Sequence, residues 1–275
     1  MKMSLMQKLW IGSWRYLSWV LPRQTALWAE DLFLTPSRVP RPLSEEGFYK
    51  SSEKITLPGG IAAYAWGSSD HPVVLLVHGW SGRGTQMGAF AEPLVEKGFR
   101  VVAVDGPAHG ASQGLRTNVG DYARFMIEAQ QSLGPLKAVV AHSFGAGCSV
   151  LAVHRGMQAE KLVLVAGPSR YELVVNNYLK FIGLSGLSQK HFFRSLEVKV
   201  GMPASEMNVG RIGNGLNVPA LIVHDEEDKE VRYKAALEIH ETWPRTELLA
   251  TQGLGHRRIL KDPVVTQKVA DFISR

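Results

Sequence analysis

Cysteine is almost absent from this 275-residue chain, whose single thiol belongs to Cys148. One cysteine excludes an internal disulfide and any metal site built from several cysteines. The chain also has only a small excess of positive charge. It contains 31 Lys and Arg residues and 25 Asp and Glu residues, which give a net charge of +6. Nucleic-acid-binding proteins carry a stronger and more clustered basic charge. The composition therefore predicts that the protein has no nucleic-acid partner.

Long apolar runs are missing as well, since no stretch reaches the roughly 18 to 20 uninterrupted apolar residues that span a bilayer. The nearest candidate runs from Leu9 to Leu21, is interrupted by Arg15, and is followed by no small-residue cleavage site. We therefore expect this stretch to be retained and the protein to be cytoplasmic.

The same stretch has the spacing of an amphipathic helix. Trp10, Trp14, Leu17 and Leu21 fall on one helical face, which is the outline of a helix lying at a membrane interface. Aromatic stripes more often pack inside proteins, so the favoured interpretation is that this face packs on the protein's own body or on a second subunit. A homodimer and a weak membrane-surface contact through residues 1–22 both stay open.

Residues 1–50 are predicted to form a helical appendage followed by a proline-rich linker. A second amphipathic run ends at Thr35-Pro36, and Pro40 and Pro42 then prevent regular structure. A second domain is expected over residues 51–275.

A regular alternation of strands and helices fills this second domain. Short, almost wholly apolar runs are typical of strands buried on both faces of a parallel sheet. The expected strands are a hairpin of Ile55–Leu57 and Ile61–Trp66, then Val73–Val77, Val101–Val104, Ala138–Ala141, Leu162–Val165, Ala220–Val223 and the weaker Glu247–Ala250. The expected helices occupy about residues 86–97, 118–133, 144–155, 231–242 and 263–274.

This alternation predicts an α/β fold, with a mostly parallel eight-stranded sheet and helices on both of its faces. One gap, between Pro168 and Pro219, contains no strong strand pattern. It is too long for a structureless loop in a compact domain. A small helical cap is therefore predicted at about residues 170–215.

Ligands of open parallel sheets bind beyond the carboxyl ends of the strands, and a serine stands at such a position. Ala141-His142-Ser143-Phe144-Gly145 joins a buried strand to a helix. A sharp strand-to-helix turn exposes the serine hydroxyl and needs small residues two before and two after it. At the N-terminus of the helix, free backbone N–H groups and the helix dipole favour a developing oxyanion. The pattern predicts that Ser143 is a nucleophile.

A serine hydroxyl needs a base, and the base needs an orienting acid. His256 lies on a glycine-flanked loop after the last strand, and Asp228 follows the preceding strand. Ser143, Asp228 and His256 thus follow the chain order serine, acid, histidine, and all three lie beyond carboxyl ends of strands. They are the predicted catalytic residues, in which Ser143 attacks a carbonyl, His256 moves the proton and Asp228 orients the imidazole.

Residues from about Ile55 to Arg275 resemble the α/β-hydrolase fold superfamily, in the branch with an H-G-x oxyanion loop. By this resemblance His78-Gly79-Trp80 is the oxyanion loop, and the backbone N–H groups of Trp80 and Phe144 hold the charged oxygen. The run from Asp105 to Ser112 is similar to the superfamily's D-x-P-G-H-G-x-S turn, with Ala108 in place of its glycine. The long gap resembles its variable cap. The resemblance also favours Asp228 over the acidic residues around it, which are Asp225, Glu226, Glu227 and Glu230.

Several other polar residues have competing roles. His78, Gly79 and His142 are expected to belong to the binding site, where His78 braces its loop and His142 shapes the pocket floor. His109 is expected to make a structural hydrogen bond. The Arg83 side chain either lies in solvent or binds an anionic substrate. We favour the interpretation that it lies in solvent.

No metal and no cofactor are predicted. His224 with Asp225 and Asp228 lacks the further ligands that a divalent metal site needs. The predicted function is therefore that of a carboxylesterase-like serine hydrolase, which cleaves a small-molecule carboxylic ester through an acyl-enzyme. A thioesterase, a C–C hydrolase, an acyltransferase and a slow-turnover ligand-binding protein of the same fold stay open as alternatives, because the same three residues serve all of them.

Overall fold

The computed structural model describes residues 5–275, which form two compact units. The helical unit contains the residues up to Thr35 together with Arg170–Met207, and the sheet unit contains Pro36–Ser169 together with Asn208–Arg275. The first boundary between the two units lies between Thr35 and Pro36. The predicted domain boundary near residue 50 is a different division of the chain and stays a prediction.

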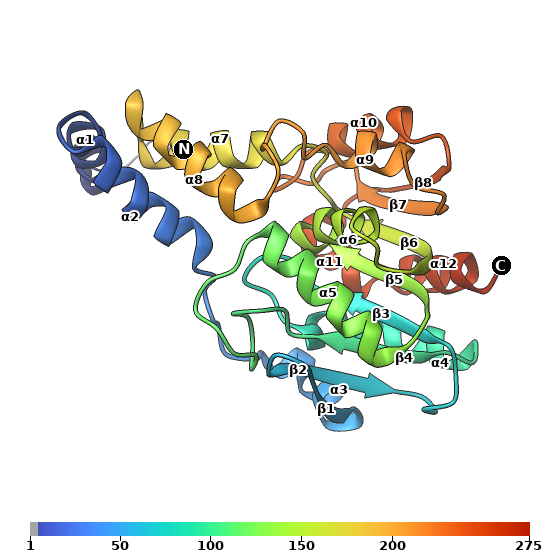
Figure 1. Cartoon of the computed structure of the whole chain (residues 1–275). Coiled ribbons are helices and arrows are strands. Elements are labelled where there is room, and N and C mark those ends of the chain that lie inside the picture. The colour runs from blue at the N-terminus through green and yellow to red at the C-terminus, as the bar shows by residue number, and fades with distance from the viewer. Residues whose placement is uncertain (1–4) are drawn as a thin grey trace. The chain divides into compact units, whose positions relative to one another are not determined.

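The sheet unit is built on an eight-stranded sheet with the order β1-β2-β4-β3-β5-β6-β7-β8 (Figure 1). β2 pairs antiparallel with β1 on one side and with β4 on the other. All the remaining neighbours in the sheet pair parallel. The strands are β1 (Glu53–Leu57), β2 (Ile61–Trp66), β3 (Val73–Val77), β4 (Arg100–Val104), β5 (Leu136–His142), β6 (Ala159–Val165), β7 (Ala220–Asp225) and β8 (Thr246–Thr251). The prediction of an α/β fold with a mostly parallel eight-stranded sheet is confirmed.

Helices occupy the connections between these strands. The sheet unit contains η1 (Leu43–Glu45), α3 (Glu46–Ser51), η2 (Gly84–Phe90), α4 (Ala91–Glu96), α5 (Val119–Leu133), α6 (Phe144–His154), α9 (Val209–Asn214), α10 (Lys234–Thr242), α11 (Gly255–Arg258), η3 (Ile259–Lys261) and α12 (Pro263–Ser274). Side chains cap three of them, because Asn118, Asn208 and Asp262 accept hydrogen bonds at the starts of α5, α9 and α12. The single helix expected over residues 86–97 is wrong in detail, since a 3-10 helix runs to Phe90 before α4 begins.

The strands are buried on both faces, as their continuous apolar sequence predicts. Val74 and Leu76 of β3 belong to a core that contains Phe90 and Phe272 from the helices η2 and α12. Leu75 points to the opposite face, because side chains alternate along a strand, and it is equally inaccessible to solvent. The sheet is therefore a rigid base whose carboxyl-terminal edge can hold side chains in fixed positions.

Four helices make up the helical unit. They are α1 (Leu5–Val20), α2 (Pro22–Leu34), α7 (Tyr171–Ile182) and α8 (Leu187–Val200), so the stretch predicted as a helical cap is indeed helical. The hydroxyl of Tyr178 donates to the Ala29 carbonyl, and the Phe33 ring lies 4.8 Å from the Tyr178 ring and 5.7 Å from the Phe192 ring. Segments far apart in the sequence thus form one small core (Figure 1).

The face of α1 that carries Trp10 and Trp14 packs within this unit. The rings of Trp10 and Phe181 are 6.1 Å apart, and Ser188 of α8 donates to the Ser18 carbonyl. This agrees with the interpretation that the face packs on the protein's own body. Within residues 5–275, no helix has the length and apolarity required to cross a membrane.

Candidate active site

Ser143 sits at a strained turn between β5 and α6. Its backbone adopts φ 51° and ψ −117°, a left-handed conformation that few residues other than glycine occupy. Gly145 makes the turn possible, because a Cβ at that position would lie 2.6 Å from the His78 carbonyl oxygen. The sharp strand-to-helix geometry predicted from Ala141 to Gly145 is therefore present, and it lifts the serine hydroxyl away from the sheet.

The structure brings Ser143, His256 and Asp228 into one hydrogen-bonded chain. The Nε2 atom of His256 lies 3.0 Å from the Oγ atom of Ser143, and its Nδ1 atom lies 2.7 Å from Oδ2 of Asp228. Both the carboxylate and the imidazole are almost fully buried. The three residues come from the ends of β5, β7 and β8, which lie at the same edge of the sheet.

Asp228 is held in its ionised form. Burial by itself would raise its pKa, but hydrogen bonds from His224 and His256 and from the backbone N–H of Val231 keep the pKa of this carboxyl well below its usual range. Its Oδ1 atom accepts from the N–H groups of Glu230 and Val231, at 2.8 and 2.9 Å. A charged acceptor therefore faces the Nδ1–H of His256.

The acidic residues next to Asp228 make other contacts. Asp225 accepts the hydroxyl of Thr251 and the backbone N–H of Leu254, so it anchors the turn that carries His256. Glu226 is exposed and accepts from Gln252. Among the described acids of residues 225–230, Asp228 is the one that contacts Nδ1 of His256.

Glu230 approaches the other nitrogen of the imidazole. One of its oxygens lies 4.0 Å from Nε2 of His256, but half of its side chain is exposed and it pairs with Arg257 at 3.2 Å. Solvent screens such a pair strongly. Glu230 is therefore a weak influence on His256 compared with Asp228.

His142 has a position that its sequence context did not reveal. Its Nε2–H donates to the backbone carbonyl of His256 at 3.0 Å, and the two rings are 4.7 Å apart. Burial, with the neighbouring His256 as a smaller cause, lowers the pKa of His142 to about 3. A neutral imidazole therefore supports the backbone of His256, which no local pattern in the sequence could indicate.

The His78-Gly79-Trp80 loop lies directly against the serine turn. A Cβ at Gly79 would be 3.0 Å from the Cβ of Ser143. A single tautomer of the His78 ring holds this loop. Its Nε2 accepts the N–H of Gly106, and its Nδ1–H donates to the Gly79 carbonyl. Burial lowers the pKa of His78 to about 4, so the ring stays neutral and both bonds persist near neutral pH.

The ring of Trp80 is held between two aromatic neighbours. It contacts Phe144 with the ring centroids 5.1 Å apart, and His109 with the centroids 5.3 Å apart, both edge to face. His109 donates from Nδ1 to the Pro107 carbonyl at 2.9 Å. Phe144 is the first residue of α6, and the N–H groups of a first helical turn have no partner within the helix.

The loop after β4 is organised by a buried carboxylate. Asp105 accepts the N–H groups of Gly84 and Ala111 and the hydroxyl of Tyr64. Ala108 adopts φ 66°, the left-handed region in which glycine is the easier residue. The alanine that stands in place of the superfamily's glycine thus carries backbone strain.

Arg38 is a residue that the sequence analysis missed. Its guanidinium donates to four backbone carbonyls of the loop after β4, those of Ala108, Gly110, Ser112 and Gly114. An arginine in a proline-rich segment gives no local signal of such a contact. The segment that starts at Pro36 is therefore attached to the loop that supports His109.

The expectation that Arg83 lies in solvent is wrong, and Cys148 is buried as well. Arg83 does not lie in solvent, since it is mostly buried and its Nε lies 3.8 Å from a carboxylate oxygen of Glu45. Cys148 is buried in α6, and burial raises the pKa of its thiol well above the ordinary value, which makes it unreactive. Within residues 5–275, no group of three His, Cys, Asp or Glu side chains is arranged to hold a metal ion.

Proteins named serine hydrolase-like match part of this sequence. The chain is 36% identical over 101 residues to a human protein named serine hydrolase-like protein, and the match covers 34% of this chain and 49% of that relative. A second human protein, serine hydrolase-like protein 2, is 36% identical over 101 residues and is covered to 32%. The chain thus spans about half or less of the length of these relatives.

Solved structures share the fold. An esterase from Pyrococcus furiosus matches with a TM-score of 0.62 at 20% identity, covering 88% of this chain and 95% of that chain. A thioesterase domain from the curacin biosynthetic pathway matches with a TM-score of 0.59 at 20% identity, covering 82% of this chain and 98% of that chain. The model of the alpha/beta hydrolase family matches residues 74–266, which is more than half of the chain. The predicted superfamily is confirmed, whereas the branch with an H-G-x oxyanion loop stays a prediction. The chain belongs to the alpha/beta hydrolase family.

Proposed function

We propose that this protein is a serine hydrolase that cleaves small carboxylic esters through an acyl-enzyme on Ser143. One observation carries the proposal, the relay in which Oγ of Ser143, both nitrogens of His256 and Oδ2 of Asp228 are joined by contacts of 3.0 and 2.7 Å. A serine hydroxyl is a weak nucleophile at neutral pH, and this relay is the arrangement that activates it.

The tautomer of His256 follows from its partners. The ionised Asp228 accepts a hydrogen bond, so Nδ1 of His256 carries the proton and Nε2 is free to accept the proton of the Ser143 hydroxyl. As Oγ bonds to the carbonyl carbon, the proton moves to Nε2 and the carbonyl π electrons move to its oxygen. Asp228 stabilises the imidazolium that forms.

The second half of the cycle reverses these roles. The tetrahedral intermediate collapses, the bond to the leaving oxygen breaks, and the Nε2–H of His256 protonates the leaving alcohol. Water then attacks the acyl group on Ser143 with His256 again acting as base, which releases a carboxylic acid and restores the serine.

Two backbone N–H groups are the proposed donors to the oxyanion. That of Phe144 opens α6 and lies at the positive end of the helix dipole, and that of Trp80 belongs to the loop held against the serine turn by His78. Donors fixed before the reaction stabilise developing charge efficiently, because they need no reorganisation.

The aromatic rings beside the serine support an apolar group on the substrate. Trp80 and Phe144 pack edge to face next to Ser143, and a third of the Trp80 side chain is open to solvent. An alkyl or aryl acyl chain laid against these rings loses contact with water, which favours binding.

Covalent labelling tests the nucleophile. We expect a fluorophosphonate probe to label the wild-type protein stoichiometrically, and p-nitrophenyl esters to be turned over repeatedly. Ser143→Ala removes the attacking oxygen and should abolish both signals.

The control for this experiment is Ser149→Ala. It alters a buried serine of α6, the helix that follows Ser143, whose hydroxyl donates to the Ala146 carbonyl. This variant should still be labelled. Labelling that persists in Ser143→Ala, or a single stoichiometric burst of p-nitrophenol with no further turnover, would contradict the proposal.

A further inference from the structure

The N-terminal part of the sequence has an unusual charge and side-chain composition. The first 29 residues contain no Asp or Glu, four cationic side chains and four of the chain's seven Trp residues. Trp, Tyr and basic residues together are the composition of helices that lie in the headgroup region of a membrane.

α1 carries large apolar side chains on two opposite sides. One face packs on α7 and α8. The opposite face exposes Tyr16 to 66%, Trp19 to 82% and Val20 to 46%. Large exposed apolar side chains beside a basic residue, here Arg15, are typical of a helix face that binds a membrane surface.

Exposed side chains are present in α2 as well. This helix is separate from α1, because the backbone of Leu21 (φ −129°, ψ 61°) leaves the helical conformation between them. Within α2, Arg23 and Leu27 are exposed and lie one helical turn apart, so they share one side of this helix.

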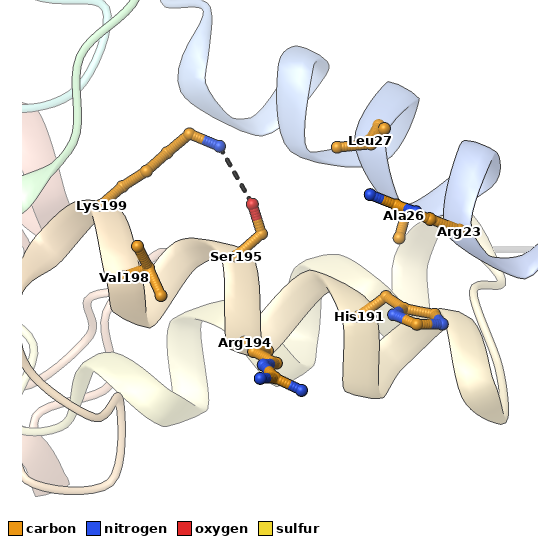
Figure 2. A pocket seen from close by; sticks show the side chains of 8 residues that line it. All are labelled: Arg23, Ala26, Leu27, His191, Arg194, Ser195, Val198 and Lys199. Carbon is orange, nitrogen blue, oxygen red and sulfur yellow. Dashed lines mark hydrogen bonds between the residues drawn. The ribbon is translucent and has the colours of Figure 1, made fainter.

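Arg23 and Leu27 also form one wall of a pocket of about 480 Å³. Figure 2 shows α8 supplying the other wall, with His191, Arg194, Ser195, Val198 and Lys199. Val198 is 78% exposed and adds an apolar side chain from α8 to this pocket. We call the surface formed by Tyr16, Trp19, Val20, Arg23, Leu27, Arg194 and Val198 the interfacial face.

The free charge of this pocket is positive. Glu30 is buried and bonds to two residues that line the pocket, to Lys199 at 2.5 Å and to the Ser195 hydroxyl at 3.0 Å. Arg23 and Arg194 form no ion pair with any side chain in the described part of the chain. Two uncompensated guanidinium groups thus stand beside an apolar and aromatic surface.

We propose that the interfacial face binds the surface of a bilayer containing anionic phospholipids. Trp19 and Tyr16 would lie among the headgroups and upper acyl chains, and Arg23 and Arg194 would bind lipid phosphates. Charge favours a lipid surface over a second copy of the chain, since a symmetric dimer through this face would bring the same unpaired arginines together. The face is wider than residues 1–22, because α8 contributes to it.

Vesicle co-sedimentation of the full chain tests this proposal. We expect binding to vesicles of phosphatidylcholine with a quarter phosphatidylglycerol, weak binding to pure phosphatidylcholine, and a loss of binding at high salt, because salt screens the arginines. Arg23→Glu combined with Arg194→Glu should weaken binding by more than about tenfold. Trp19→Ser should weaken it by about tenfold.

Two controls match these variants outside the face. Arg124→Glu reverses an exposed arginine of α5, and Leu115→Ser removes an apolar side chain that is as exposed as Trp19, at 82%. Both should bind vesicles like the wild type. The face variants and Leu115→Ser should keep the wild-type unfolding midpoint, because each changed side chain is exposed. Arg124→Glu loses a surface pair with Asp121 and should cost less than about 1 kcal/mol.

Failure to bind anionic vesicles, or equal binding by the wild type and both face variants, overturns the proposal. A dimer that Trp19→Ser dissociates, with no vesicle binding, overturns it in favour of self-association. None of these readouts requires Ser143, so they are independent of the proposed hydrolysis.

Discussion

Asp228 has a distinct role although four other acidic residues lie within the same six-residue turn. The run from Asp225 to Glu230 contains five acids, and their positions along a tight turn point them in different directions. The backbone N–H groups of Glu230 and Val231 hold one oxygen of Asp228, which leaves the other oxygen aimed at His256. Orientation, rather than acidity, is what sets Asp228 apart.

Asp228→Asn should lower the turnover number for p-nitrophenyl esters by about three to four orders of magnitude. The amide can keep the backbone contacts of Asp228, but its NH₂ group favours an acceptor at Nδ1 of His256. The proton then sits on Nε2, which can no longer accept from Ser143. Steady-state kinetics of the purified variant measure the effect.

Glu226→Gln is the matched change for this experiment, because Glu226 lies in the same turn but is exposed. It should leave the turnover number within about twofold of the wild type. Equal losses in the two variants would show that the turn as a whole, rather than Asp228, is required.

The segment from Pro36 to Pro42 has no regular structure but is firmly attached. Arg38 bonds to four carbonyls of the loop after β4, and the guanidinium of Arg41 stacks 3.6 Å above the ring of Tyr49. Proline fixes the backbone and removes N–H donors, so side chains supply the contacts of this segment instead. The loop it holds includes His109, which packs on the ring of Trp80.

Arg38→Ala should lower the free energy of unfolding by about 1–2 kcal/mol, because several charge-assisted hydrogen bonds are lost at once. Chemical denaturation followed by circular dichroism measures this change. Arg124→Ala removes an exposed arginine that pairs with Asp121 alone, and it should cost less than about 1 kcal/mol. Identical denaturation midpoints for both variants would argue against the anchoring role.

The strands of the sheet were predictable as elements, whereas several short helices were not. An unbroken apolar run such as Val73–Val77 fits a strand buried on both faces, and the predicted and observed bounds agree for this strand. α9, over Val209–Asn214, contains two glycines in six residues, and its local sequence disfavours a helix. Tertiary packing therefore decides that element.

Three buried histidines make the stability of the whole protein depend on pH. Burial lowers the pKa of His78 to about 4, and that of His109 and His142 to about 3. Each ring donates to a carbonyl as a neutral imidazole. In the unfolded chain the same groups titrate near 6.5.

Between these values the unfolded state binds more protons than the folded state, so the free energy of unfolding falls as the pH falls. We expect a loss of about 1.4 kcal/mol per pH unit for each histidine as the pH drops from about 6 toward 4. Urea denaturation at a series of pH values measures the slope.

His109→Gln should reduce this slope by about one third while the other two histidines continue to act. An unfolding free energy that stays constant from pH 6.5 to pH 5 would show that the buried rings are not neutral.

The sequence by itself determined the class of fold and the position of the serine turn, because both depend on neighbouring residues. Continuous apolar runs specify strands buried on both faces, and small residues around Ser143 specify a sharp turn. His256 and Asp228 could be predicted as partners from their places after strands, since parallel strands end at one edge.

The tertiary structure alone decided which side chains reach one another across long stretches of chain. It selected the oxygen of Asp228 that meets His256, brought His142 to the carbonyl of His256, and placed Arg38 on a loop 70 residues away. It also decided which face of α1 is packed and which is left open. Such contacts depend on the spatial arrangement of whole elements, which no local pattern encodes.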